Sequence, residues 1–124
     1  MELKFDDKGL IPAVIQDFKT GEVLMVAYMN HEAFSKTLAT GRVHFFSRSR
    51  NKIWLKGESS GHFQTLREIL TDCDRDTLVL RVDQKGGACH LGFRTCFVYK
   101  LNELGEISEV TQDKVFDPEK TYGE

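Results

Sequence analysis

The residues with the clearest potential for chemistry lie in one five-residue segment that contains three aspartates and a cysteine. Asp72, Asp74 and Asp76 alternate there with Cys73 and Arg75. Carboxylate oxygens favour magnesium or calcium, whereas thiolates favour zinc. The segment therefore indicates metal chemistry, with two kinds of ligand side by side.

The three aspartates can share one ion only if the chain bends between them. In a straight strand they would point together and Cys73 would point away, but the outer pair would lie roughly 13 Å apart, too far for bonds of about 2.1–2.5 Å. We therefore expect a curve or a turn, and an acidic solvated turn without metal is the alternative. An EF-hand calcium loop is disfavoured, because Thr77 replaces the required glycine and Asp83 the required glutamate.

The cysteines form the second candidate group. The chain has three of them, Cys73, Cys89 and Cys96, and an odd number favours reduced thiols over a complete disulfide framework. Three protein ligands and an open fourth position are typical of catalytic zinc, whose bound water loses a proton near neutral pH. His90 adjoins Cys89 and could be a fourth ligand or a general acid–base. Small buried thiols without a metal are the alternative.

The third group is a basic stretch over residues 41–57 that has no acidic residue. Arginine side chains and backbone N–H groups suit phosphate, and a tryptophan could stack on a base. The stretch alone favours a solvated hairpin tip, but the two candidate metal groups nearby in the sequence favour a nucleotide or phosphate pocket, with Arg48, Arg50, Trp54 and Lys56 as its candidate substrate contacts. A solvated hairpin tip with core aromatics and a nucleic-acid patch are the alternatives.

A hairpin and a helix are expected before the basic stretch. Apolar runs at 11–17 and 22–28, separated by Lys19-Thr20-Gly21, predict two paired strands. Asn30 is suited to the N-cap of a helix and Gly41 to its end, which predicts a helix over residues 31–40.

The remainder of the chain is predicted to be mostly strand. Strand patterns cover residues 43–47, 53–56, 77–82 and 95–99. Residues 63–70 fit either a helix or a strand, and the polar tail from Thr111 is expected to fray or to form a small helix. The predicted fold class is α+β, strand-rich, with a short helix after the first hairpin.

The composition limits the classes of protein to which the chain can belong. A chain of 124 residues with 40% hydrophobic and 29% charged residues is typical of one soluble domain. A formal charge of −2 argues against bulk nucleic-acid binding. No secretory signal is visible, and the longest apolar run, Val23 to Met29, is too short to span a bilayer, so we expect a cytoplasmic protein without a membrane partner.

With these residues in hand, the chain closely resembles the phosphoribosyl-AMP cyclohydrolases, a family of histidine biosynthesis that opens the adenine ring. The match runs from Val23 through Phe97. It is carried by Ser47-Arg48-Ser49-Arg50, Trp54-Leu55-Lys56-Gly57-Glu58, Ser59-Ser60-Gly61-His62, Asp72-Cys73-Asp74-Arg75-Asp76 and Ala88-Cys89-His90-Leu91-Gly92, followed by Cys96-Phe97. Departures are small, with Leu91 where threonine is usual and Thr95 where serine is usual.

The resemblance implies two metals and a second subunit. Zinc is implied on Cys73, Cys89 and Cys96, and magnesium on Asp72, Asp74 and Asp76. It also implies an intertwined homodimer whose zinc site draws cysteines from both subunits. The chain ends at Glu124, so we expect one cyclohydrolase domain over residues 1–124 without the pyrophosphohydrolase domain that is fused to it in some relatives.

The reaction implied is hydrolysis of a small nucleotide, phosphoribosyl-AMP, with zinc-activated water attacking C6 and the N1–C6 bond breaking. His90 is the candidate that moves the proton, and His62 and His44 are the alternatives. A nucleoside deaminase is disfavoured, since its H-x-E and P-C-x-x-C signatures are missing. The remaining alternative is a nucleic-acid-binding or structural zinc module without catalysis.

Overall fold

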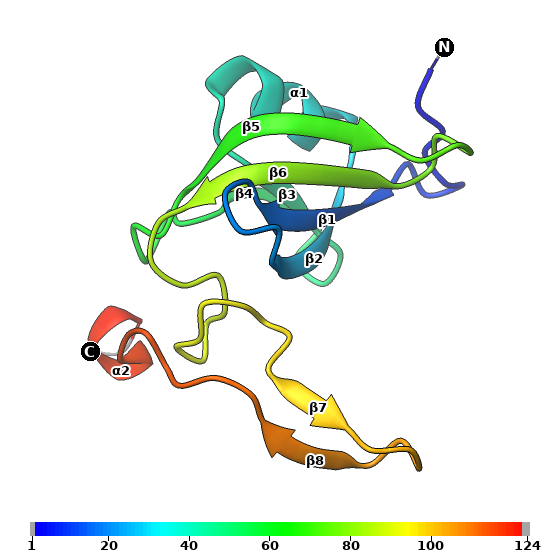
Figure 1. The fold of residues 1–124 in the computed structure, drawn as a ribbon. Helices are drawn as coiled ribbons and strands as arrows, with labels where there is room; N and C mark the ends of the chain where they lie inside the picture. The colour runs from blue at the N-terminus through cyan, green and yellow to red at the C-terminus, as the bar shows by residue number, and fades with distance from the viewer. Residues whose placement is uncertain (1, 123–124) are drawn as a thin grey trace.

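A four-stranded mixed sheet forms the main body of the molecule, above the C-terminal hairpin in the view of Figure 1. The computed structural model describes residues 2–122. The sheet has the order β2-β1-β6-β5 and contains β1 (Ile11–Asp17), β2 (Val23–Met29), β5 (Gln64–Thr71) and β6 (Leu78–Gln84). The first hairpin and the strand at 77–82 are thereby confirmed. The ambiguous segment 63–70 is a strand.

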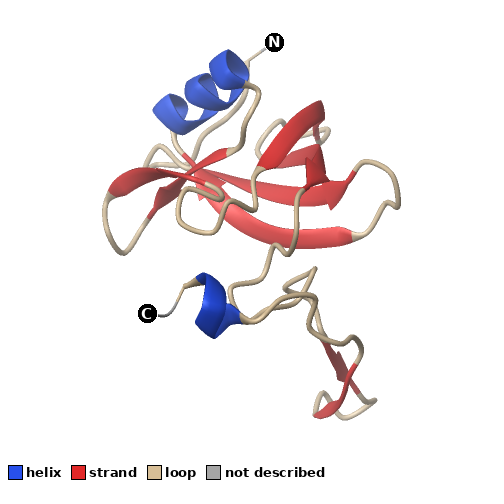
Figure 2. Cartoon of the chain, turned by 90° about the vertical axis from the view of Figure 1, so that its left-hand side faces the viewer, coloured by secondary structure: helices blue, strands red, loops and turns tan. Residues whose placement is uncertain are grey.

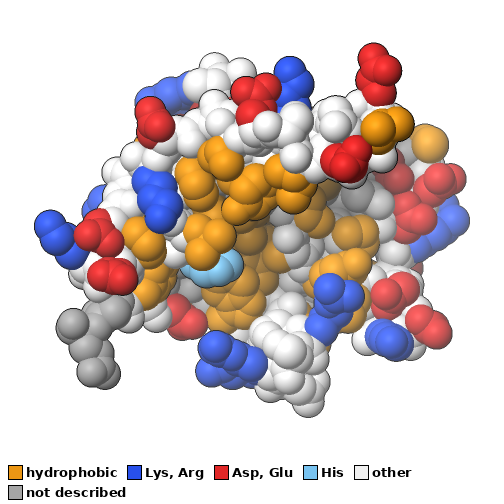
Figure 3. All heavy atoms as spheres, turned by 90° about the horizontal axis from the view of Figure 1, so that it is seen from below, with side chains coloured by type: hydrophobic (Ala, Val, Ile, Leu, Met, Phe, Trp, Pro, Cys, Tyr) orange, Lys and Arg blue, Asp and Glu red, His pale blue; other side chains and the backbone are white. Residues whose placement is uncertain are grey.

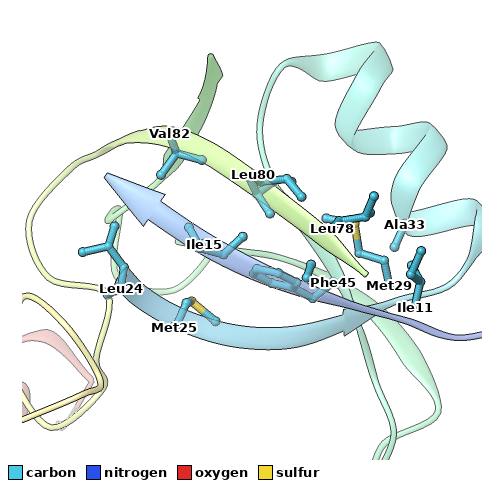
Figure 4. Packing of buried hydrophobic residues seen from close by; sticks show 13 residues of the cluster. Ile11, Ile15, Leu24, Met25, Met29, Ala33, Phe45, Leu78, Leu80 and Val82 are labelled. Carbon is cyan, nitrogen blue, oxygen red and sulfur yellow. The ribbon is translucent and has the colours of Figure 1, made fainter. Parts of the chain in front are cut away.

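The sheet places its apolar residues on one face because of the register between β1 and β6. These strands pair in parallel, with Ala13 opposite Leu78 and Ile15 opposite Leu80. Every second residue of each strand is buried. Since side chains alternate across a strand, the in-register pairing directs both sets to the same face. That face holds the hydrophobic core (Figure 4).

Helix α1 (His31–Thr40) packs next to this core. Asn30 begins it, with its side-chain oxygen accepting from the Ala33 N–H at 2.8 Å. Gly41 ends it at φ 72°, in the left-handed region that glycine favours, and its N–H donates to the Thr37 carbonyl. The helix predicted over residues 31–40 is therefore confirmed at both ends.

A second hairpin comprises β3 (His44–Ser47) and β4 (Lys52–Leu55). Both strands lie within one residue of the predicted bounds. Phe45 is fully buried and points into the core among Ile15 and Met25 (Figure 4). This contact fixes the hairpin on the sheet, so the basic residues of its turn and of its second strand have a rigid support.

The chain after β6 differs most from expectation. Residues 85–98 form a loop, followed by the hairpin β7 (Tyr99–Leu101) and β8 (Ile107–Val110) and the short helix α2 (Pro118–Thr121). The hairpin extends away from the sheet (Figures 1 and 2). The small helix in the tail is confirmed, and β8 was not predicted.

The predicted strand at 95–99 is wrong except at its last residue. The Cys96 N–H donates to the Leu24 carbonyl at 2.7 Å, and the Thr95 hydroxyl donates to the Val23 carbonyl at 2.7 Å. These bonds attach the segment to the free edge of β2, but one of them comes from a side chain, so no regular ladder forms. Apolar β-formers are present here, yet side-chain bonding replaces pairing.

The described residues form one strand-rich domain with short helices, which agrees with the predicted α+β class. Between residues 2 and 122, no helix is both long enough and apolar enough to cross a membrane.

Candidate active site and metal-ligand residues

A cavity of about 290 Å³ lies beside the end of β4 and the loop after β6. The sequence-predicted residues on its wall are Arg50, Trp54, Lys56, His90 and Cys96. On the face that carries the C-terminal segment, hydrophobic side chains gather around a hollow with a histidine beside it (Figure 3). The structure thus brings together side chains that are up to 46 positions apart (50 to 96) in the sequence.

Lys56 is the buried cation of this cavity. Its residue is only 7% exposed, and its ammonium group donates to the Ala88 carbonyl at 2.7 Å. Burial lowers the pKa of Lys56, while the nearby thiols of Cys96 and Cys89 act in the opposite direction. The Lys56 amino group thus lies next to two thiols and 5.9 Å from the centre of the Trp54 ring.

Two of the three cysteines lie side by side. Burial raises the pKa of the Cys96 thiol to about 11, and the adjacent Cys89 thiol adds to this effect through a hydrogen bond and its own charge. Without a metal, the Cys96 thiol is therefore protonated at neutral pH. Two soft sulfur donors beside a cavity are a partial zinc ligand set.

A tight turn presents Cys89 and His90. The Cys89 carbonyl accepts from the Gly92 N–H at 3.1 Å, and the Cys89 N–H donates to the Phe93 carbonyl at 3.1 Å. His90 lies at the exposed tip of this turn and lines the cavity. Arg94 holds the start of the loop, because its guanidinium donates to the carbonyls of Gln84, at the end of β6, and Gly86, and pairs with Asp17 of β1.

The aspartate segment forms the expected turn between β5 and β6. The Asp72 carbonyl accepts from the Arg75 N–H at 3.0 Å, and its carboxylate accepts from the Asp76 N–H at 3.1 Å. One ligand oxygen from each of the three aspartates lies within 4.8 Å of the others. Because the segment is a turn with Arg75 at φ 64°, strand alternation does not set the direction of Cys73.

The carboxylates of this turn affect one another's pKa. A hydrogen bond shared with Asp72 raises the pKa of Asp76, and the charges of Asp72 and Asp74 raise it further. Three exposed carboxylates are held close together here, and their mutual repulsion would be relieved by a divalent ion.

Cys73 lies apart from the other two cysteines. It is exposed in the aspartate turn, before the start of β6, whereas Cys89 follows the end of that strand. A strand of seven residues separates the two ends by roughly 20 Å at about 3.3 Å per residue. In residues 2–122 the aspartates are the only set of three metal-ligating side chains with this close spacing, so one chain does not gather the three thiols.

The other predicted residues lie outside the cavity. Arg48 extends over Tyr28, with its guanidinium carbon 4.1 Å from the ring centre. His44 has its Nδ1 atom 2.8 Å from the Arg42 carbonyl. His62 packs edge-on against Phe116. Of the three candidate histidines, His90 alone lines the cavity.

The two departures from the family pattern have different surroundings. Thr95 is buried, donates its hydroxyl proton to Val23 and accepts from the Phe97 N–H at 3.0 Å. It therefore keeps the hydroxyl that the usual serine would provide. Leu91 is 45% exposed, and nothing in its contacts explains the change from threonine.

Several lining residues were not predicted as contacts from the sequence. Glu58, Ser59 and Ser60 follow Lys56 and complete one wall, and Met25 comes from β2. Tyr122, at the end of α2, also lines the cavity. The polar residues around Tyr122 in the sequence do not indicate a binding role, because only the fold brings the C-terminal tail to this cavity.

Comparison with known proteins agrees with the resemblance found in the motifs. The profile of the phosphoribosyl-AMP cyclohydrolase family matches residues 25–98. A phosphoribosyl-AMP cyclohydrolase from Chlorobaculum parvum is 54% identical over 121 residues, covering 98% of this chain and 88% of that protein. The protein of the same name from Pelotomaculum thermopropionicum is 54% identical over 98% of this chain and 93% of its own.

A third relative is longer. The histidine biosynthesis bifunctional protein HisIE from Thermoanaerobacter pseudethanolicus is 57% identical over 123 residues, 98% of this chain. The chain spans about half, 55%, of the length of that relative. Each of these matches covers 98% of the chain, so they include most of the C-terminal residues that the family profile leaves out.

Proposed function

Because the chain belongs to the phosphoribosyl-AMP cyclohydrolase family, we propose that it opens the adenine ring of phosphoribosyl-AMP at the N1–C6 bond, as a step of histidine biosynthesis. The observation that carries this proposal is the cavity itself. It combines two cations, Arg50 and Lys56, with the aromatic ring of Trp54 and with His90 beside a pair of thiols. Such a combination suits a phosphorylated purine, and a purely structural zinc module would not need it.

The cations and the tryptophan orient the nucleotide. Arg50 offers a planar fork of donors that matches a phosphate group, and its exposed position gives the phosphate access from solvent. Lys56 provides a fixed positive charge deeper in the cavity. Trp54 supplies the face on which the purine packs.

His90 is the proton carrier of this proposal. Addition of water across the N1–C6 bond places the oxygen on C6 and a proton on N1, so a group must move that proton from the attacking water to the leaving nitrogen. Imidazole is suited to this transfer near neutral pH. His90 lines the cavity from the tip of its turn, whereas His44 and His62 do not reach it.

The thiols fit zinc, and the aspartates fit magnesium. Cys89 and Cys96 would hold zinc together with Cys73 of a second copy. Zinc supplies a Lewis acid that lowers the pKa of water and stabilises the thiolates. Asp72, Asp74 and Asp76 would hold magnesium, which would neutralise a phosphate or brace the turn.

A homodimer is part of the proposal, for two reasons. Cys73 cannot reach the other thiols within one chain, as the length of β6 implies. In addition, the hairpin β7–β8 presents four apolar residues that are each more than half exposed and lie opposite one another in pairs: Tyr99 with Val110, and Leu101 with Ile107. An isolated two-stranded hairpin is marginally stable in water, and such a patch is typical of a surface covered by a partner.

The test is to measure metal content and ring opening on the same purified protein. We expect zinc to co-purify, turnover to stop when a chelator removes it, and turnover to return when zinc alone is restored. Cys89→Ala should lack both zinc and activity. A zinc-free protein with full activity would refute the zinc mechanism. Salt-dependent binding of oligonucleotides without any turnover would favour a nucleic-acid module instead.

A further inference from the structure

The C-terminal residues 116–122, which we call the C-terminal clasp, dock on the loop that carries the candidate zinc ligands. The N–H of Phe116 donates to the Gly92 carbonyl at 3.3 Å. The ring of Phe116 lies 4.5 Å from that of His62 in an edge-on contact, and 6.1 Å from the ring of Tyr122. The clasp is therefore held by a backbone bond and a row of three rings.

The loop leaves no room for side chains where the clasp docks. A Cβ atom on Gly87 would come within 2.6 Å of a ring carbon of Phe116. A Cβ atom on Gly92, which has φ 104°, would come within 2.6 Å of the Phe116 carbonyl oxygen. Two glycines that flank Cys89 and His90 thus permit close contact with Phe116. This contact sets the position of everything that follows in the clasp.

Helix α2 then directs Tyr122 to the cavity. Asp117 caps the helix by accepting from the Glu119 N–H at 2.9 Å. The N–H of Tyr122 donates to the Pro118 carbonyl at 2.8 Å and closes the helical turn.

Tyr122 lines the same cavity as Trp54, Lys56 and His90, and it is 41% exposed. A large ring that is not fully packed by the protein is available to a ligand.

We propose that Tyr122 is a substrate-binding residue, whose ring acts with Trp54 to hold the purine, and that the C-terminal clasp exists to position it. This inference rests on the proposed function. The N1-substituted adenine ring carries positive charge, and aromatic faces attract cationic as well as stacked rings. Tyr122 lies outside residues 25–98, so it is no part of the family profile.

The experiment uses the chain's own fluorescence. Trp54 is the only tryptophan, so a change in emission on adding AMP reports binding in this cavity. Tyr122→Ala should weaken AMP binding and raise the KM for phosphoribosyl-AMP by about tenfold or more, the usual effect of losing one stacking ring. The zinc content and kcat should stay close to those of the parent protein.

Two further variants separate ring contact from structure. Tyr122→Phe keeps the ring and should retain the KM of the parent. Phe116→Leu should raise KM although Phe116 does not line the cavity, and adding it to Tyr122→Ala should cause little further loss, because both act through one contact. Leu38→Ala, which truncates an exposed residue on α1, is the control and should change nothing.

The outcomes distinguish this inference from the function on which it rests. If the parent protein turns over phosphoribosyl-AMP and Tyr122→Ala keeps its KM and its AMP affinity, the inference is wrong and the function stands. A lower kcat with unchanged KM would also overturn it, since that result would indicate a disturbed Cys89–His90 loop. If the parent protein neither binds AMP nor opens the ring, both proposals fall.

Discussion

Two arginines of the same turn show how much depends on the direction of a single side chain. Arg50 lines the cavity with Trp54, whereas Arg48 lies over the ring of Tyr28. Their identity and spacing predicted a basic hairpin that could bind a phosphate group. The sequence could not say which arginine faces the cavity, since that choice depends on the turn geometry, including Asn51 at φ 52°.

Replacing Arg50 with alanine should raise the KM for phosphoribosyl-AMP by about 10- to 100-fold, because a charged hydrogen bond to phosphate contributes about 1.5–3 kcal/mol. The matched variant Arg48→Ala should have a smaller effect, because its contact is with Tyr28. Steady-state kinetics of both variants provide the measurement. Equal effects of the two changes would mean that the nucleotide extends around the hairpin, contrary to the site described above.

Replacing His90 with alanine should lower kcat by about 10²- to 10⁴-fold, the usual contribution of a general acid–base. Zinc should remain bound, because the thiols that would hold it are unchanged. His44→Ala is the matched control, since that ring lies outside the cavity. Loss of zinc from His90→Ala would identify His90 as a ligand, and an unchanged kcat would exclude it as the proton carrier.

Among the secondary-structure elements, the sequence predicted correctly those whose ends are set by contacts within the element itself. Asn30 and Gly41 define α1 because their own atoms make the caps. The segment around Cys96 was misread as a strand, since its partners are carbonyls of β2 more than 70 residues earlier in the chain. Strand β8 was missed because its side chains are exposed, so no alternation of buried and solvent-facing residues marks it.

The contact between β1 and the loop after β6 predicts a pH-dependent stability. The Asp17 side chain is 4% exposed and pairs with Arg94. Burial alone would raise the pKa of Asp17, but the hydrogen bonds from Lys19, Arg94 and Thr20 outweigh it and hold the pKa below 3.8. A group whose pKa is depressed by folding stabilises the protein above its unfolded pKa, so this contribution is complete above about pH 4 and is lost as the pH falls further.

Asp17→Asn should therefore lower the free energy of unfolding at neutral pH by about 2 kcal/mol. Urea denaturation at a series of pH values provides the measurement. The difference between the variant and the parent should shrink as the pH falls below 3.8, the usual pKa of the carboxyl. Glu32→Gln is the control, because its exposed pair with Lys36 contributes about 0.5 kcal/mol or less. A difference that stays constant with pH would contradict this account.

At the scale of the whole molecule, the candidate zinc site is incomplete in one chain. Cys96 lines the cavity and lies beside Cys89, while Cys73 lies at the opposite end of β6. The apolar face of β7–β8 is likewise open in the single chain. Motifs could indicate that three thiols belong together, but only the length of β6 shows that Cys73 lies too far from the other two within one chain.

Mixing two inactive variants tests whether the zinc site is shared between subunits. Cys73→Ala and Cys89→Ala should each lack zinc and activity when alone. When the two chains are refolded together, half of the dimers contain one chain of each variant. Each mixed dimer regains one of its two sites, so about a quarter of the parent activity and zinc should return.

A mixture of Cys89→Ala with Cys96→Ala is the control and should regain nothing, because neither chain then offers an intact Cys89–Cys96 pair. Zinc analysis and ring-opening assays on both mixtures provide the measurement. Recovery in neither mixture would contradict a site shared between subunits, and activity of Cys73→Ala alone would remove Cys73 from the site.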